Sequence, residues 1–124
     1  ADKKNTNVVI KSEKHKIEDW SLIIEQVQVS DTKDLRNVVD NHKNTNDRLC
    51  VVVFSVDDDR VAIVSGVTKN LSETISAKDV VNIVAGNIGG KGGGRSEFAQ
   101  GAGETKNIDE FVTSILNSVQ SLAT

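Results

Sequence analysis

The sequence predicts an α+β fold, a mixed α/β sandwich in which a sheet of about four strands is packed by three helices. Three observations lead to this prediction. Residues 49–54 are apolar on both faces, which is typical of a central strand that is covered on both sides. Segments with strand-like alternation are interleaved with segments of helical periodicity. Their order is strand, helix, two strands, helix, short strand and helix, which favours helices packed on a mixed sheet.

The first half of the chain predicts a strand–helix–strand unit followed by a hairpin. Residues 20–29 form the first strand, because an apolar run passes into alternating Val and Gln. Ser30 and Asp31 are turn and cap residues for the first helix. Residues 49–54 and 60–67 are the next strands, joined by a short acidic turn. The crossover makes the first two strands parallel. The helix stripe consists of Leu35, Val38, Val39 and His42.

The second half of the chain predicts two helices on either side of a glycine-rich stretch. Ser76 and Asp79 form a capping-box pattern at the start of the second helix, and Gly86 is a natural end for it. Residues 98–100 add a short strand, and Asn107 caps the third helix. The buried stripes are Ala77, Val80, Val81 and Val84 in the second helix, and Ile108, Phe111 or Val112, Ile115, Val119 and Leu122 in the third.

Residues 1–19 are polar and carry mixed charge, so we expect a solvated N-terminal segment, a linker or the frayed edge of a longer protein. Within it, only residues 7–10 have the pattern of a short strand. Residues 20–124 then form a single globular domain, a length that supports one core. The chain does not begin with Met, which also favours a fragment or a processed protein.

Composition excludes several classes of function. The net charge of -3 argues against a generally basic nucleic-acid binder, so any RNA or DNA contact needs a local cationic patch. Cys50 is the only cysteine and is expected to be a core thiol, which leaves no internal disulfide and fits a cytoplasmic compartment, with a mitochondrial one left open. The spacing of His15, His42 and Cys50 matches no usual zinc site. We expect no membrane association, because no apolar run approaches transmembrane length.

Eight of the nine glycines lie between residues 86 and 103, and five of them lie between residues 89 and 94. This predicts a loop whose N–H groups, with Lys91 and Arg95, hold an anion such as a phosphate. A flexible linker or a tight structural turn is the alternative. The stretch fails the P-loop pattern, since Gly92 stands where Ser or Thr is needed. It also fails the dinucleotide pattern, since Arg95 replaces the last Gly.

Residues 89–95 (Gly-Gly-Lys-Gly-Gly-Gly-Arg) and 98–103 (Phe-Ala-Gln-Gly-Ala-Gly) resemble the glycine-rich motif of the C-terminal, DHH-associated domain of alanyl-tRNA synthetases. Some DHH-family phosphoesterases share this domain. The order of helices and strands is also similar, so the resemblance covers roughly residues 20–122. Residues 96–98 are Ser-Glu-Phe, where bacterial members often have Pro-Asp-Met.

The resemblance implies a non-catalytic C-terminal module of an alanine-tRNA ligase. In that family the aminoacylation and editing sites lie in earlier domains. The C-terminal domain holds the outer corner of the tRNA, helps the two active sites share one tRNA, and can support a homodimer. The parent would use ATP, magnesium and an editing-site zinc, and we expect this fragment to bind no cofactor. The implied partners are alanine tRNA and the synthetase's own catalytic and editing domains.

By analogy, the tRNA contact would be made by the glycine-rich stretch and the strand that follows it. The predicted nucleic-acid-binding residues are Gly89, Gly90, Lys91, Gly92, Gly93, Gly94, Arg95 and Gln100.

Two other functions remain open. The first is a dimerisation module, or one that binds DNA or protein, with weak or no tRNA binding, which the negative net charge favours. The second is the substrate-binding half of a DHH phosphoesterase, whose catalytic half would lie elsewhere in the parent protein.

Overall fold

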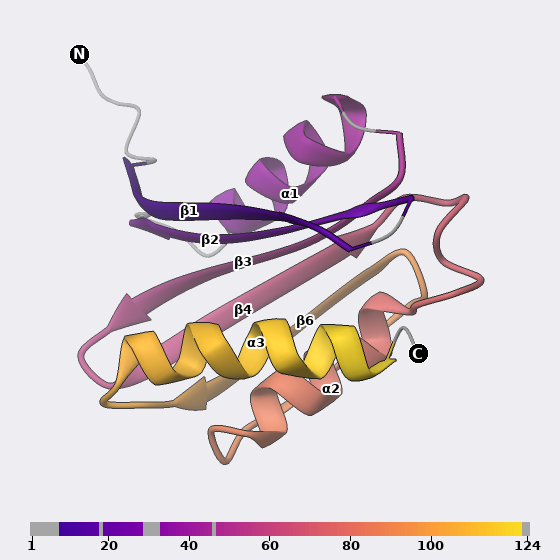
Figure 1. Ribbon diagram of the computed structural model, residues 1–124. Helices are drawn as coiled ribbons and strands as arrows, with labels where there is room; N and C mark the ends of the chain where they lie inside the picture. Colours follow the sequence, from indigo (N-terminus) through magenta and orange to yellow (C-terminus); the bar gives the residue numbers. More distant parts are fainter. Residues whose placement is uncertain (1–7, 18, 29–32, 46, 123–124) are drawn as a thin grey trace.

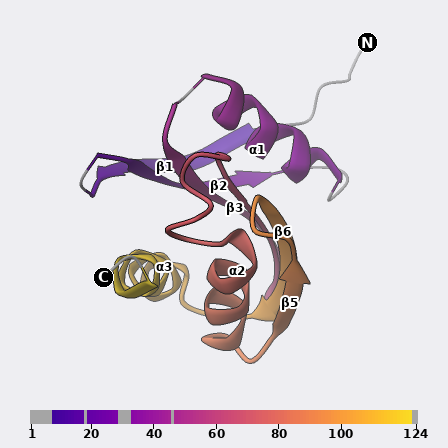
Figure 2. The same cartoon turned by 90° about the vertical axis from the view of Figure 1, so that its right-hand side faces the viewer.

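The structure, a computed structural model, describes residues 8–17, 19–28, 33–45 and 47–122. It is a six-stranded mixed sheet with α1 on one face and α2 and α3 on the other (Figures 1 and 2). The sheet order is β1-β2-β3-β4-β6-β5. The α+β class predicted from the sequence is confirmed. The elements are β1 (Val8–Lys16), β2 (Ser21–Gln28), α1 (Lys33–Thr45), β3 (Leu49–Asp57), β4 (Arg60–Val67), α2 (Ala77–Gly86), β5 (Lys91–Gly94), β6 (Phe98–Glu104) and α3 (Ile108–Leu122).

The central strands follow the prediction. β2 and β3 are parallel, with Ser21 opposite Leu49, and β3 and β4 form an antiparallel hairpin. The predicted cap at Ser30 and Asp31, together with Val29, lies outside the described residues. The sheet is buried on both faces at its centre because an apolar cluster forms on each side of it.

The larger apolar cluster lies between the sheet and the two helices α2 and α3, and their predicted stripes face it. Phe54 of β3 and Phe111 of α3 meet there edge to face, with 5.0 Å between ring centroids. Cys50 is fully buried in the same cluster, as expected of a core thiol. Its burial raises the pKa of the thiol to about 12, although a hydrogen bond with Ser65 acts in the opposite direction.

Most of the side chains of residues 11–16 are exposed, as expected, but these residues are not a frayed segment. These residues belong to β1, which pairs antiparallel with β2 from Val8 opposite Gln28 to Lys16 opposite Ser21. β1 is the edge strand beyond β2, and most of its side chains are exposed, so its charged residues conceal the strand pattern. β1 and β5 are the two strands beyond the expected four, and they bring the sheet to six strands.

The prediction of a loop is wrong for the middle of the glycine-rich stretch. Residues 91–94 form β5, which pairs antiparallel with β6 at the other edge of the sheet. β6 runs over seven residues and not only over 98–100. Glycine has low strand propensity because ordering it costs more backbone entropy, so the sequence pattern favoured a loop.

The predicted capping box of α2 is absent. Ser76 occupies the N-cap position, but its side chain makes no capping hydrogen bond. Instead, the backbone N–H groups of Ala77 and Lys78 donate to the carbonyl oxygens of Ser96 and Arg95, at 2.9 and 3.1 Å. The β5–β6 turn therefore accepts the hydrogen bonds of the free N–H groups in the first turn of α2. The cap of α3 is confirmed, since the Glu110 N–H donates to Asn107 Oδ1 at 3.0 Å.

Candidate nucleic-acid interface

The register of β4, β6 and β5 decides which side chains share a face. Directly opposed residues of neighbouring strands point to the same side of the sheet, and successive residues alternate. Lys91 lies opposite Ala102, and Gly93 lies opposite Gln100. Gln100 in turn lies opposite Val64, which packs in the apolar cluster beneath α1. These residues therefore lie on the α1 side of the sheet.

Helix α1 packs mainly on β3 and β4, so it leaves the same face of β6 and β5 uncovered. Figure 2 shows these two strands at the lower right, below α1, with the upper end of β6 close to the helix. We call this uncovered surface the open face. It consists of Lys91, Gly93, Arg95, Gln100 and Ala102, and Phe98 lies beside it at the edge of α1.

The opposite face of β5 is closed by α2. A Cβ atom on Gly92 would overlap Val81 Cγ1 of α2, and one on Gly101 of β6 would lie 2.8 Å from the same methyl group. A Cβ atom on Gly90 would overlap the carbonyl oxygen of Ala102. Gly90, Gly92 and Gly101 thus let helix and strands approach closely, which is a packing role.

A cavity of about 200 Å³ opens where the β5–β6 hairpin meets α1. The guanidinium carbon of Arg36, on α1, lies over the ring of Phe98, 4.4 Å from its centroid. This is a close cation–π contact. The lining residues are Arg36, Gly93, Gly94, Arg95, Phe98, Ala99 and Gln100.

Arg36 was missed in the sequence analysis. It lies on the solvent side of a helix that precedes the glycine motif by some fifty residues, and no local pattern marks it. Only the placement of β6 next to β4 brings Phe98 under α1. That sheet order has no signal in the sequence.

Three cations of this region have no acidic partner within the part of the chain that the structure describes. Arg36, Lys91 and Arg95 are all exposed, and none forms an ion pair with any residue in the described ranges. Lys11 and Arg48, in contrast, pair with Glu13 and Asp19. The charge of the three side chains is therefore available to a bound anion.

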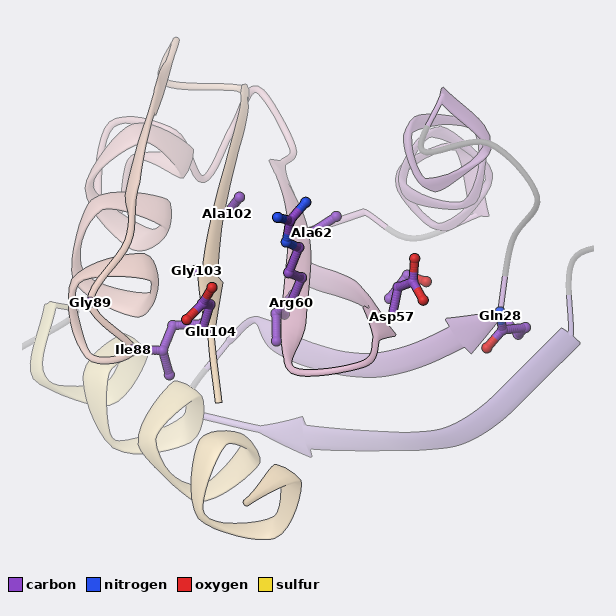
Figure 3. Close-up of a pocket in the computed structure, with 11 residues that line it drawn as sticks. Gln28, Asp57, Arg60, Ala62, Ile88, Gly89, Ala102, Gly103 and Glu104 are labelled. Carbon is purple, nitrogen blue, oxygen red and sulfur yellow. The ribbon is translucent and has the colours of Figure 1, made fainter. Parts of the chain in front are cut away.

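A second, larger hollow of about 1,030 Å³ lies at the opposite end of the β4–β6 pair. Figure 3 shows Arg60 there, with Glu104 on one side and Asp57 on the other. Two carboxylates outnumber one guanidinium, so this hollow is a poor site for phosphate. Gly89, with φ +71°, lines this hollow.

The structure therefore divides the eight predicted site residues. Gly93, Gly94, Arg95 and Gln100 come together in the small cavity, and Lys91 lies on the same open face. Gly90 and Gly92 serve packing, and Gly89 lies at the other hollow.

The described part of the chain holds no group of three or more His, Cys, Asp or Glu side chains that could bind a metal ion. Nor do the described residues include a helix long and apolar enough to cross a membrane.

Comparison with known proteins gives the family. The family model described as "DHHA1 domain" matches residues 19–121. The chain belongs to the DHHA1 domain family. This DHHA1 domain is similar to the alanine–tRNA ligase of Francisella philomiragia, with 36% identity over 104 residues, which is 83% of this chain and 12% of that ligase. It is 43% identical to the alanine–tRNA ligase of Ruthia magnifica over 96 residues, 77% of this chain and 11% of that protein.

The fold of this DHHA1 domain is also that of a solved structure, the C-Ala domain of alanyl-tRNA synthetase from Aquifex aeolicus. The TM-score is 0.78 at 27% identity, and the match covers 87% of this chain and 98% of that one. The resemblance to C-terminal domains of alanyl-tRNA synthetases is thus confirmed. The chain spans only about a tenth of the ligases that it matches.

Proposed function

We propose that this DHHA1 domain is the tRNA-binding C-terminal module of an alanine–tRNA ligase. It holds the outer corner of alanine tRNA on its open face and helps the aminoacylation and editing sites share one tRNA. The chemistry, with ATP, magnesium and an editing-site zinc, belongs to other domains of the parent, which acts in the cytoplasm. The family match and the ligase relatives support this proposal at the level of the parent.

The observation that carries the proposal is the set of unpaired cations on and beside the open face. Arg36 and Arg95 line the small cavity, Lys91 lies on the same open face, and none of the three has an acidic partner in the described residues. Phosphate contacts from Lys and Arg supply most of the affinity of sequence-independent binding to nucleic acids. The exposed amide of Gln100 adds donors that suit sugar or phosphate oxygens.

The net charge of -3 is compatible with this interface because the charge is unevenly distributed. Carboxylates gather at the larger hollow, where Asp57 and Glu104 lie, whereas the cavity lining contains two arginines and no acid. Charges separated by more than the Debye length, about 8 Å at physiological salt, are largely screened from each other. The local cationic patch, and not the net charge of the chain, therefore governs the encounter with RNA.

We expect Lys91→Ala and Arg95→Ala each to weaken binding of an alanine tRNA transcript and to reduce the slope of log K against log [salt] by roughly 1. Filter binding or fluorescence anisotropy over a salt series measures both quantities. Lys16→Ala is the matched control, because Lys16 is an exposed lysine on β1, at the opposite edge of the sheet. Unchanged slopes in both variants would count against the proposal.

A dimerisation module is the second candidate, and one observation favours it. Val9 and Ile10 of β1 are each 54% exposed on an edge strand of the described sheet. Exposed apolar edges are prone to pair with another chain. Light scattering that gives a dimer, together with no retention of tRNA, would support this function in place of tRNA binding.

A further inference from the structure

We infer that Arg36, supported by the ring of Phe98, is a stacking platform for a base of the bound RNA. The inference rests on the proposed function, since it concerns how the same interface takes hold of tRNA. It adds a contact to a base, from outside the glycine motif, to the phosphate contacts proposed above.

The aromatic residues of the chain leave one place for stacking. The chain has three Phe, one Trp and no Tyr. Trp20, Phe54 and Phe111 are buried in the core, with at most 4% of each exposed. Phe98 alone is partly exposed, and it lies beside the open face. Among the Phe and Trp rings of this domain, a base therefore finds only Phe98 within reach of the surface.

Arg36 covers that one ring. Its guanidinium carbon lies 4.4 Å from the centroid of Phe98, while the side chain remains exposed. No carboxylate among the described residues competes for it. The contact with the ring restricts the rotamers of Arg36, which lowers the entropy lost when a ligand binds.

The platform is held in place from both sides. Phe98 packs against the apolar cluster beneath α1, which includes Leu35, the neighbour of Arg36 in the chain. In the β5–β6 turn, the Arg95 backbone N–H donates to the Phe98 carbonyl oxygen at 2.7 Å. A phosphate held by Arg95 and a base stacked on Arg36 would thus belong to neighbouring positions of one RNA.

The chemistry selects an unstacked or terminal base. Proteins that recognise folded RNA stack exposed bases on aromatic rings or on the planes of Arg guanidinium groups. Such stacking tolerates any base because every base has a π-face. Lysine keeps the positive charge but lacks the plane, so Arg36→Lys separates stacking from simple electrostatic attraction.

The test measures binding of an alanine tRNA transcript to the full chain over a salt series. We expect Arg36→Lys to weaken binding by about 5- to 150-fold at each salt concentration, the range for loss of one stacked base, with the salt slope unchanged. Phe98→Leu, which keeps an apolar side chain but removes the ring, should give a loss of the same kind. Arg60→Lys is the matched control and should bind like the wild type.

Wild-type affinity in Arg36→Lys would overturn the inference, and so would a loss confined to variants that unfold, as judged by circular dichroism. A wild type without salt-dependent binding would instead refute the proposed function. Transcripts with single abasic nucleotides give the second readout. When the base that stacks on Arg36 is the one removed, Arg36→Lys should cause no further loss of affinity. If Arg36→Lys weakens binding equally at every abasic position, the inference is overturned.

Discussion

The glycines of the β5–β6 hairpin fall into two groups at the scale of single residues. Gly92 faces α2, where a Cβ atom would overlap Val81 Cγ1. Gly93 faces the open side, and a Cβ atom there would have no heavy atom within 4 Å. The missing side chain of Gly92 therefore allows close packing against α2, whereas the missing side chain of Gly93 leaves the backbone open to a ligand.

A matched pair of substitutions separates these two roles. Gly92→Ala should lower the free energy of unfolding by about 1–3 kcal/mol, because a methyl group is forced into a closed contact. Gly93→Ala should change it by less than about 0.5 kcal/mol. The new methyl group of Gly93→Ala would enter the cavity beside Arg95, so tRNA binding should weaken although the fold is intact. Urea denaturation and anisotropy measure the two effects, and equal destabilisation by both variants would contradict the assignment.

Cys50 should make the folded chain less stable as the pH becomes alkaline. Burial raises the pKa of its thiol from 9.0 to about 12 in the folded chain. Above pH 9 the unfolded chain releases the proton and the folded chain keeps it, so the free energy of unfolding falls as pH rises. This group alone should remove about 1 kcal/mol between pH 8 and pH 10. Urea midpoints of wild type and Cys50→Ala over that range provide the measurement, and parallel curves would show that the thiol makes no such contribution.

At the scale of elements, local periodicity predicted β2, α1, β3, β4, α2 and α3, because each has an apolar face with a clear period. It predicted only the first residues of β1, within the short strand expected at residues 7–10, and it did not predict β5. In β1, charged residues on an exposed edge hide the alternation, and in β5 there are almost no side chains to alternate. Both strands exist because the neighbouring strand offers a backbone partner, which is a tertiary effect. The glycine-rich motif groups Lys91, Arg95 and Gln100 by their closeness in the sequence, whereas no such closeness marks Arg36.

β1 also completes the environment of a buried carboxylate. Glu25 of β2 is only 5% exposed, and its Oε2 accepts a hydrogen bond from Ser12 Oγ of β1 at 2.9 Å. His42 Nε2 of α1 lies 3.2 Å from the same oxygen. A chain that starts at residue 20 lacks the Ser12 donor and exposes the edge of β2.

We therefore expect residues 20–124 to be less stable than residues 1–124 by at least about 1–3 kcal/mol, because the cost of leaving Glu25 without its Ser12 donor adds to the loss of the β1–β2 pairing. The exposed β2 edge should also promote association at high concentration. Urea denaturation and light scattering test the two effects. Ser12→Ala keeps the strand and should show part of the loss in stability without association. Equal stability of the two chain lengths would mean that β1 is dispensable.

At the scale of the whole molecule, the three layers give the sheet two different surfaces. α2 and α3 cover one face, and α1 covers only part of the other, so the β5–β6 hairpin presents its backbone and its cations beside α1 (Figure 2). The hairpin turn is tied to α1 as well, since Lys43 Nζ donates to the Glu97 carbonyl oxygen at 3.2 Å. Arg36 and Arg95 are thus held in a fixed relation by elements far apart in sequence.

The central claim is that the open face is where tRNA binds, and amide chemical-shift mapping tests it most directly. Titration of the ¹⁵N-labelled chain with alanine tRNA should shift the amides of β5, of β6 and of Arg36 and its neighbours in α1. The amides on the exposed sides of α2 and α3, such as those of Asn82 and Asn117, should stay in place. Shifts centred on α2 and α3, or no shifts at low salt, would contradict the claim.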